Sequence, residues 1–469
     1  MQDISYVENR VFDEIQPGET ASISRKLTRQ DIELCALVSG DVNPAHLDHD
    51  YAATDMFHRV IAHGMWGGGL ISAVLGTELP GPGAIYLSQS LRFLKPVSLG
   101  DTITASVTVT GKHPEKKTVT FDCRCTNQDG KDVIVGQAEV LAPVEKVRRP
   151  RMELPHVRLA NHDHYNRLLK KARSDRPVPT AIVHPCSAAA IEAVVEAAEE
   201  QLIEPILIGP EARIRQAAEA AGKDISAFRI VPVPHSHAAA ARAVEMVHCG
   251  EAQLLMKGSL HTDELMGAVV AHATGLRTER RISHAYVMSV PERESPLIIT
   301  DAAINIAPDL EAKADIIRNA IDLAHVIGIE LPKVAILSAV ETVNPAMQST
   351  LDAAALCKMA DRGQITGGVL DGPLAFDNAI SPAAAKEKGI VSPVAGRAEV
   401  LIVPNLEAGN MLAKQLTFLG DADAAGVVLG ARVPIILTSR ADSLRTRLAS
   451  CAVAVLVARA APKAAPGLT

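Results

Sequence analysis

HGMWGGGLISAVLGTEL, residues 63–79, is a run of apolar and small side chains whose first charged group after His63 is Glu78. An α-helix that is apolar on every side is buried in a protein core. Its glycines carry no Cβ, so neighbouring strands can approach it closely. We therefore expect a buried helix that begins near His63 and is surrounded by other secondary structure.

The residues after this helix alternate between apolar and polar side chains. The alternation runs from Asp101 to Val109, from Val119 to Cys125 and from Val133 to Val140, and the turn signal NQDG separates the last two runs. A period of two predicts β-strands, and strands joined by short turns predict an antiparallel meander. One buried helix wrapped by a curved antiparallel sheet is the hot-dog arrangement. An α+β hot-dog domain is therefore expected over residues 1–142.

The pattern changes after a basic stretch punctuated by prolines. Residues 143–155, PVEKVRRPRMELP, show no period, and we expect a linker over 143–160. Beyond it, short apolar runs such as TAIVHP, PILIGP, QLLMKG, AYVMSV and VPIILTS alternate with alanine-rich helical segments. This alternation predicts parallel strands covered by helices. Residues 161–469 are therefore expected to form an α/β domain of two subdomains, with mostly parallel sheets and a central cleft.

Composition and charge exclude several classes of function. Hydrophobic residues make up 48% of the chain and charged residues 22%, as in ordinary globular proteins. The net charge of −7 and the 3% of aromatic residues argue against binding of nucleic acid. No apolar stretch reaches the ~18 residues of a membrane span, and the polar start resembles no signal peptide. The seven scattered cysteines suggest no disulfide framework, so we expect a cytoplasmic protein that acts on small molecules.

The string SGDVNPAH carries the first candidate site. Asn43 and Pro44 force an extended or turn conformation, which ends the preceding helix and brings Asp41 and His46 toward one point. A carboxylate and an imidazole can share one water molecule, one group taking its proton while the other gives a proton to carbon. The helix that opens at Gly64 offers free N–H groups and a positive dipole end, which suit a thioester oxygen gaining negative charge.

This region resembles the MaoC-like, (R)-specific enoyl-CoA hydratase family, whose signature is S-G-D-x-N-P-x-H. The likeness covers about residues 10–142 and includes the HGM turn and the segment IYLSQSLRFLKPVSLGD. It implies addition of water to a trans-2-enoyl-CoA, which gives an (R)-3-hydroxyacyl-CoA. By this resemblance the catalytic residues are Asp41, His46 and Gly64, the last through its N–H, and the substrate-binding residues include Asn43 and Ser72.

Two neighbouring features need their own interpretation. Trp66 and the three glycines after it depart from the family pattern, and we expect the indole to shorten or reshape the acyl pocket. The run from His46 to Asp50 contains two histidines and two aspartates, which are metal-binding residue types. Adjacent ligands of this kind are typical of a solvated turn, so no metal site is expected there.

The second candidate site follows the strand VPIILTS, which delivers Ser439 and Arg440 at its carboxyl end. Ligands of open α/β folds bind at that end of the strands. A hydroxyl and a guanidinium there can stabilise a tetrahedral intermediate and hold phosphate in a bidentate grip. Lys257, in the string MKGS, opens a helix whose start favours anions, although the order Lys-Gly-Ser is not that of an NTP-binding loop. Arg277 adds positive charge to the same half.

These strings, with TDAAINIAP, GVLDGPLAFDNAIS, SPVAGRAEVLIVPNLEAGNMLAKQL and SRADS, are similar to the phosphate acetyl/butyryltransferase family over about residues 165–458. The resemblance implies reversible acyl transfer between CoA and phosphate in a ternary complex, without a tightly bound cofactor. It implies that Ser439 stabilises the transition state and that Arg440 and Arg277 bind phosphate or the thioester region. Further residues in matching strings are Lys257, Asn305 and Asn410 as substrate-binding, and Asp301, Asp371, Asp377 and Asn405 as shaping the cleft.

The base of this second reaction is less clear. The acetyltransferases of the family carry a carboxylate seven residues after the serine, where this chain has Thr446. Asp442, three residues after Ser439, is our candidate, as in the butyryltransferase branch, and the acyl preference stays open. Ser439 could instead cap a helix, and Asp371 and Asp377 could be turn or cap residues.

Two functions follow as hypotheses. The first is a bifunctional acyl-CoA enzyme with a hydratase site and a phosphate acyltransferase site. The alternative is a hydratase whose C-terminal domain is non-catalytic and serves acyl-CoA sensing and oligomerisation. Both families usually pair across two-fold axes, so we expect a homo-oligomer, a dimer or larger.

Overall fold

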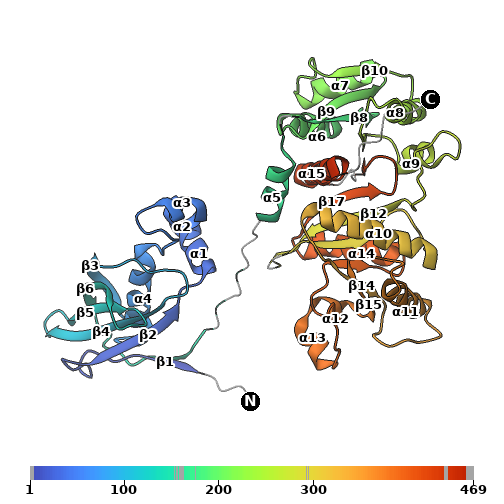
Figure 1. The fold of residues 1–469 in the computed structure, drawn as a ribbon. Coiled ribbons are helices and arrows are strands. Elements are labelled where there is room, and N and C mark those ends of the chain that lie inside the picture. Colours follow the sequence, from blue (N-terminus) through green and yellow to red (C-terminus); the bar gives the residue numbers. More distant parts are fainter. Residues whose placement is uncertain are drawn as a thin grey trace. The chain divides into compact units, whose positions relative to one another are not determined.

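In the computed structural model the chain forms two compact units, Met1–Leu159 and Ala160–Thr469 (Figure 1). Each unit has its own hydrophobic core. The structure describes residues 5–152, 154, 157, 163–174, 176–291, 293, 295–437 and 442–460.

The first unit contains a five-stranded antiparallel sheet in the order β2-β4-β5-β6-β3. Its inward side chains alternate as predicted, and Phe121 is fully buried at the centre of the core. The unit is the hot-dog fold that the sequence indicates. Its strands are β2 (Thr20–Lys26), β3 (Ile85–Phe93), β4 (Thr102–His113), β5 (Thr118–Thr126) and β6 (Asp132–Leu141), and its helices are α1 (Arg29–Ser39), α2 (Pro44–Leu47), α3 (His49–Thr54) and α4 (Gly64–Thr77).

Helix α4 begins at the predicted position, but only one of its faces is buried. Leu70, Ile71 and Val74 pack into the core. Met65 is 64% exposed and Ser72 is also exposed, on the face turned away from the sheet. The expectation of burial on every side is therefore wrong for the single chain, because the sheet covers one face of the helix.

The expected linker starts later than residue 143. Strand β7 (Arg148–Pro150) pairs with β1 (Tyr6–Glu8) in a two-stranded antiparallel ribbon. The Lys146 ammonium lies 2.7 Å from a Glu14 carboxylate oxygen and ties this stretch to the first unit. A strand of three residues is too short to show a period, so local hydrophobic pattern does not predict this pairing.

The second unit is built on one mixed sheet of eleven strands, in the order β10-β9-β8-β11-β18-β17-β12-β13-β16-β14-β15. One side of the sheet is a parallel block made of β10, β9, β8, β11 and β18. The other side is a second parallel block made of β13, β16, β14 and β15. The strands between these blocks pair antiparallel. The unit is thus the mostly parallel α/β structure predicted, with its two halves hydrogen-bonded into a single sheet.

The strands of this unit are β8 (Val178–Val183), β9 (Ile203–Gly209), β10 (Arg229–Pro232), β11 (Leu254–Lys257), β12 (Ser283–Ser289), β13 (Leu297–Thr300), β14 (Lys333–Leu337), β15 (Val369–Leu374), β16 (Val400–Ile402), β17 (Asp423–Leu429) and β18 (Ile435–Ile436). The two parallel blocks point in opposite directions because an odd number of antiparallel pairings separates them. The strands of one block therefore have their carboxyl ends where the strands of the other block have their amino ends.

Helices cover this sheet, and α15 packs against β17 in its middle (Figure 1). The helices are α5 (Asp163–Ala172), α6 (Ala188–Glu199), α7 (Glu211–Ala221), α8 (Ser236–His248), α9 (Thr262–Val270), α10 (Leu310–Ile327), α11 (Gln348–Asp361), α12 (Phe376–Ile380), α13 (Pro382–Glu387), α14 (Leu406–Leu419) and α15 (Leu444–Ala460). In the part of the chain that the structure describes, no helix combines the length and apolarity needed to cross a membrane.

Candidate active sites

The loop between α1 and α2 positions Asp41 and His46. Gly40 ends α1 with a φ of 74°, a left-handed conformation that suits glycine. Pro44 then begins α2, and the Asn43 side chain caps that helix by accepting the Ala45 N–H at 3.1 Å. Helix α1 therefore ends at Gly40 and not at Pro44. The loop that follows brings the Asp41 carboxylate and the His46 imidazole together as expected.

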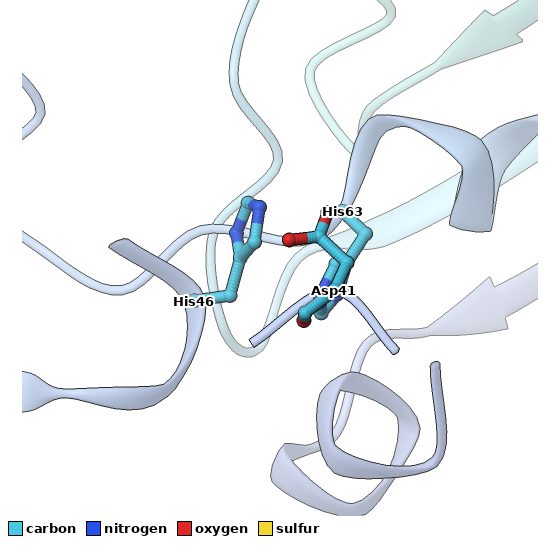
Figure 2. A group of neighbouring side chains, drawn as sticks. All are labelled: Asp41, His46 and His63. Atoms are coloured by element: carbon cyan, nitrogen blue, oxygen red, sulfur yellow. The ribbon is translucent and has the colours of Figure 1, made fainter. Parts of the chain in front are cut away.

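Figure 2 shows the Asp41 carboxylate directed toward the His46 ring, with His63 beside both. One ligand-type atom from each of these three side chains lies within 4.8 Å of the others. The His46 Nδ1 lies 2.9 Å from the Ile61 carbonyl oxygen, which orients the ring and leaves Nε2 for the site. Asp41 is exposed and His46 is half-buried, so water reaches the pair.

His63 contributes to this site through its side chain as well as its backbone. Its Nε2 lies 3.0 Å from the backbone oxygen of Asp41, which fixes the loop that presents the carboxylate. The His46 and His63 ring centroids are 4.0 Å apart. From the sequence, His63 was predicted only as the start of α4, and its position directly before Gly64 was the available signal for a role in the site.

A cavity of about 300 Å³ opens beside the pair. His46, His63 and the first residue of α4, Gly64, form one part of its wall, and Trp66 and Phe93 form another. A Cβ at Gly64 would come within 2.9 Å of the Phe93 ring, so the lack of a side chain there keeps the helix start close to that wall. Apolar side chains form most of the wall, as an acyl-chain site requires, and its polar side chains are those of His46, His63 and Lys95. Asp41 is not a wall residue and lies beside the two histidines.

Two other predicted residues of the first unit lie outside this cavity. Asn43 acts as the cap of α2, and its side chain does not line the cavity. Ser72 lies on the exposed face of α4, eight residues along the helix from Gly64, and is not a wall residue either. At 1.5 Å per residue, that is roughly 12 Å from the helix start.

In the second unit, Asp301 and Asn305 form a buried polar cluster at the end of β13. The Asn305 Nδ2 donates to Asp301 Oδ2 at 2.6 Å, and the Arg281 Nε donates to Asn305 Oδ1 at 2.9 Å. Asn410 reaches the same segment, since its Nδ2 donates to the Ala302 carbonyl at 3.2 Å. These contacts hold the segment after β13 in place.

The remaining predicted groups lie elsewhere on the sheet. Lys257 ends β11, and its Nζ donates to the Leu260 carbonyl at 3.3 Å. Three strands separate β11 from β13, which is roughly 19 Å at the spacing of hydrogen-bonded strands. Arg277 is exposed and pairs with Ala431, ahead of β18. The structure therefore does not bring Lys257 to the Asp301 cluster.

Ser439 and Arg440 lie outside the described residues, which resume at Asp442. The Asp442 carboxylate is close enough to act on Tyr286, whose pKa is raised by burial and further by that charge. The His284 ring is fully buried beside Tyr286, and burial lowers its pKa to about 4 against the opposing effect of Asp301. At neutral pH the imidazole is therefore neutral, and the Tyr286 phenol that feels the charge of the candidate base is protonated.

An open groove of about 700 Å³ lies where helices α10, α11 and α14 begin. Lys313 and Asp352 form an ion pair of 2.6 Å in its wall, and both side chains are more than nine-tenths buried. Asn405, one of the residues predicted to shape a cleft, caps α14 at this groove by accepting the Ala408 N–H. Sequence pattern does not predict this ion pair, because its two members are far apart in the chain.

Two further predicted residues have local roles in the structure. Asp371 Oδ1 accepts the N–H of Gly372 at 2.8 Å, within β15. Asp377 lies in the first turn of α12, and its carboxylate is 3.9 Å from the Lys388 ammonium. Asp371 therefore lies in a strand rather than a turn, and Asp377 lies in the first turn of a helix whose N-cap is Ala375, so neither is the turn or cap residue of the alternative interpretation.

Comparison with known proteins matches the two units of the chain to two different family models. The family model described as "Phosphate acetyl/butaryl transferase" matches residues 235–455, and the "MaoC like domain" model matches residues 13–128. The phosphate acetyltransferase of Rhizobium meliloti is 65% identical over 294 residues, which are 63% of this chain and 93% of that protein.

Two solved structures resemble the separate units. The branched-chain phosphotransacylase from Enterococcus faecalis V583 is 29% identical, covers 60% of this chain and 99% of its own, and has a TM-score of 0.54. The R-hydratase PhaJ1 from Pseudomonas aeruginosa is 46% identical, covers 33% of this chain and 100% of its own, and has a TM-score of 0.33.

The molecule is therefore a fusion of a hot-dog unit with a mostly parallel α/β unit of the acyltransferase type. The chain belongs to the phosphate acetyl/butyryltransferase family and carries a MaoC-like domain ahead of the family region.

Proposed function

We propose that the first unit hydrates trans-2-enoyl-CoA to (R)-3-hydroxyacyl-CoA. The observation that carries this proposal is the Asp41 carboxylate facing His46, whose side chain lines a mostly apolar cavity. A water molecule held between the two groups gives a proton to one of them while its oxygen adds to C3 of the substrate. The other group delivers a proton to C2, so the atoms of water are divided across the former double bond.

Negative charge builds on the thioester oxygen during this addition. The N–H of Gly64, at the start of α4, is one of the helix's amides without an intrahelical acceptor. It also lies at the positive end of the helix dipole, next to the cavity. In this role it stabilises the enolate-like oxygen in the transition state more than the carbonyl of the substrate. Trp66 in the cavity wall limits the length of the acyl chain.

For the second unit, we propose reversible transfer of an acyl group from CoA to phosphate. The Rhizobium meliloti relative is named as an acetyltransferase and the Enterococcus faecalis structure as a branched-chain enzyme, so both short and branched acyl groups are candidates. Ser439 is proposed to stabilise the transition state, and Arg440 is proposed to bind phosphate. Asp442 is the proposed base toward the CoA thiol, and its charge acts on Tyr286 in β12, whose pKa it raises.

Ser439→Ala should reduce phosphate-dependent release of CoA from acetyl-CoA or butyryl-CoA by about a hundred-fold or more, as loss of one donor to a developing oxyanion does. Arsenate in place of phosphate provides an irreversible assay of the same step. Ser443→Ala is the matched control, because the Ser443 hydroxyl contacts Thr446 at the start of α15 and, within the described residues, has no other side-chain hydrogen bond. Binding of CoA without turnover in the unsubstituted protein would support a sensing role and contradict the transferase proposal.

We also propose that the first unit pairs with a second copy. Strand β3 is the edge of its sheet and exposes Ile85, Leu87 and Phe93 to between 51% and 55%. An apolar edge strand of this kind is a template for association. Sedimentation should therefore give a dimer or larger species at micromolar concentration, with Leu87→Lys shifting it toward smaller species. A monomer in the unsubstituted protein would contradict this.

A further inference from the structure

The side chains of Asp41, His46 and His63 converge more closely than the hydration reaction requires. Their ligand-type atoms lie within 4.8 Å of one another, and the two imidazole rings are tilted by 37° with centroids 4.0 Å apart. Figure 2 shows the three side chains together. Hydration as proposed uses the carboxylate and one imidazole. The second imidazole therefore has no task in the reaction beyond holding the Asp41 loop.

Each histidine of this group already uses one ring nitrogen on a backbone carbonyl. His46 Nδ1 contacts the Ile61 oxygen at 2.9 Å, and His63 Nε2 contacts the Asp41 oxygen at 3.0 Å. Histidines that bind metal ions almost always donate their other N–H in this way, which fixes the tautomer and turns a lone pair toward the ion. The nitrogens left over are His46 Nε2 and His63 Nδ1.

The second ring nitrogen of His63, Nδ1, is a buried polar atom without a hydrogen bond among the described residues. The residue is 95% buried, since only 5% of it is exposed, and its Nδ1 has no hydrogen-bond partner among the described residues. A buried polar atom without a partner is costly and calls for an explanation by a missing ligand. A cation shared with Asp41 and His46 satisfies it.

We propose that Asp41, His46 and His63 form a binding site for a divalent first-row transition-metal ion, with Zn²⁺ as the best match. Two imidazole nitrogens and one carboxylate oxygen are a common set of three zinc ligands, with a fourth position for water. Bonds of about 2.0–2.1 Å place tetrahedral ligands about 3.3 Å apart. The ligand-type atoms already lie within 4.8 Å of one another, and Asp41, exposed on a loop, has room to move toward the two imidazoles.

This ion acts as an inhibitor of hydration. It occupies the lone pairs of Asp41 and His46 that the reaction needs for proton transfer, so enzyme with bound metal cannot share a water molecule between them. The inhibition rests on the proposed hydratase function, whereas the binding of the ion does not. The second unit contributes no ligand, so acyl transfer continues when the ion is bound.

The test begins with full-length protein stripped of metal by EDTA, to which Zn²⁺ is added in competition with a chromophoric chelator. One ion should bind per chain at this site, and His63→Gln and Asp41→Asn should each weaken it by about ten-fold or more. His49→Ala is the matched control, since His49 lies on nearby α3 but outside the group. Replacement by Co²⁺ gives a spectrum of nitrogen and oxygen ligation, which separates this site from the cysteines.

In the unsubstituted protein, Zn²⁺ should inhibit crotonyl-CoA hydration at the concentration at which it binds, and EDTA should reverse the inhibition. Unchanged affinity in both His63→Gln and Asp41→Asn would overturn the proposed site. A third outcome is that the variants lose Zn²⁺ binding while the unsubstituted protein shows no hydratase activity. That outcome would support the metal site and refute the proposed hydration reaction.

Discussion

Asp41→Asn should lower the rate of crotonyl-CoA hydration by about two to four orders of magnitude, the usual contribution of a positioned acid or base. The carboxylate faces His46, which lines the cavity, and it accepts the Asn43 N–H at 3.2 Å through Oδ1. An asparagine amide keeps that hydrogen bond through its oxygen and nearly the same shape. It cannot take up a proton from water, so the chemical step fails while the loop stays folded.

The KM for crotonyl-CoA should change little in this variant, because the cavity and the Gly64 amide are intact. Asp50→Asn is the matched control, since Asp50 is an exposed aspartate on nearby α3. Hydration should continue at the unsubstituted rate in that control. A drop of less than ten-fold in Asp41→Asn would show that another group carries the proton.

Lys313→Met should destabilise the second unit by about 3–5 kcal/mol. Lys313 in α10 and Asp352 in α11 are 2.6 Å apart and only 6% and 7% exposed, and Gln348 donates to the other Asp352 oxygen at 2.8 Å. Removal of the ammonium leaves a buried carboxylate with a single neutral donor. The cost of that unpaired charge dominates the effect.

The double variant Lys313→Met/Asp352→Leu should recover most of the lost stability, because apolar residues of similar volume often replace a buried ion pair without loss. Lys358 forms an exposed ion pair with Asp361 within α11. Lys358→Met should lower the free energy of unfolding by less than about 1 kcal/mol. Urea unfolding followed by circular dichroism measures these differences. The single tryptophan, Trp66, reports separately on the first unit, whose transition should not move. A double variant as unstable as Lys313→Met would contradict the ion-pair explanation.

Much of the fold could be predicted from local pattern. The alternation in β4 and β5, the start of α4 and most strands of the second unit follow from hydrophobic periodicity. Strand β17 was missed, since its sequence DAAGVVL contains alanine and glycine where strands usually carry β-branched residues. The pairing of β17 and β12 between two opposed parallel blocks is a property of the complete sheet. No single segment signals it.

The candidate site was predictable where its residues are close in sequence. Asp41 and His46 share one short string, and the loop between two helices brings them together. The His63 side chain and the Lys313–Asp352 pair depend on tertiary packing, since their partners belong to other elements. The sequence also grouped Lys257 with Asn305 on the basis of family strings, whereas the order of strands separates them. Such distances follow from topology and cannot be read from spacing along the chain.

The most direct measurement assays both reactions on one preparation of the unsubstituted chain, Asp41→Asn and Ser439→Ala. Hydration of crotonyl-CoA and phosphate-dependent release of CoA are followed side by side. Two independent thioester sites predict that the unsubstituted protein performs both reactions and that each variant loses one reaction and keeps the other. A chain that performs only one of them, or a variant that loses both while folded, would contradict the presence of two working sites.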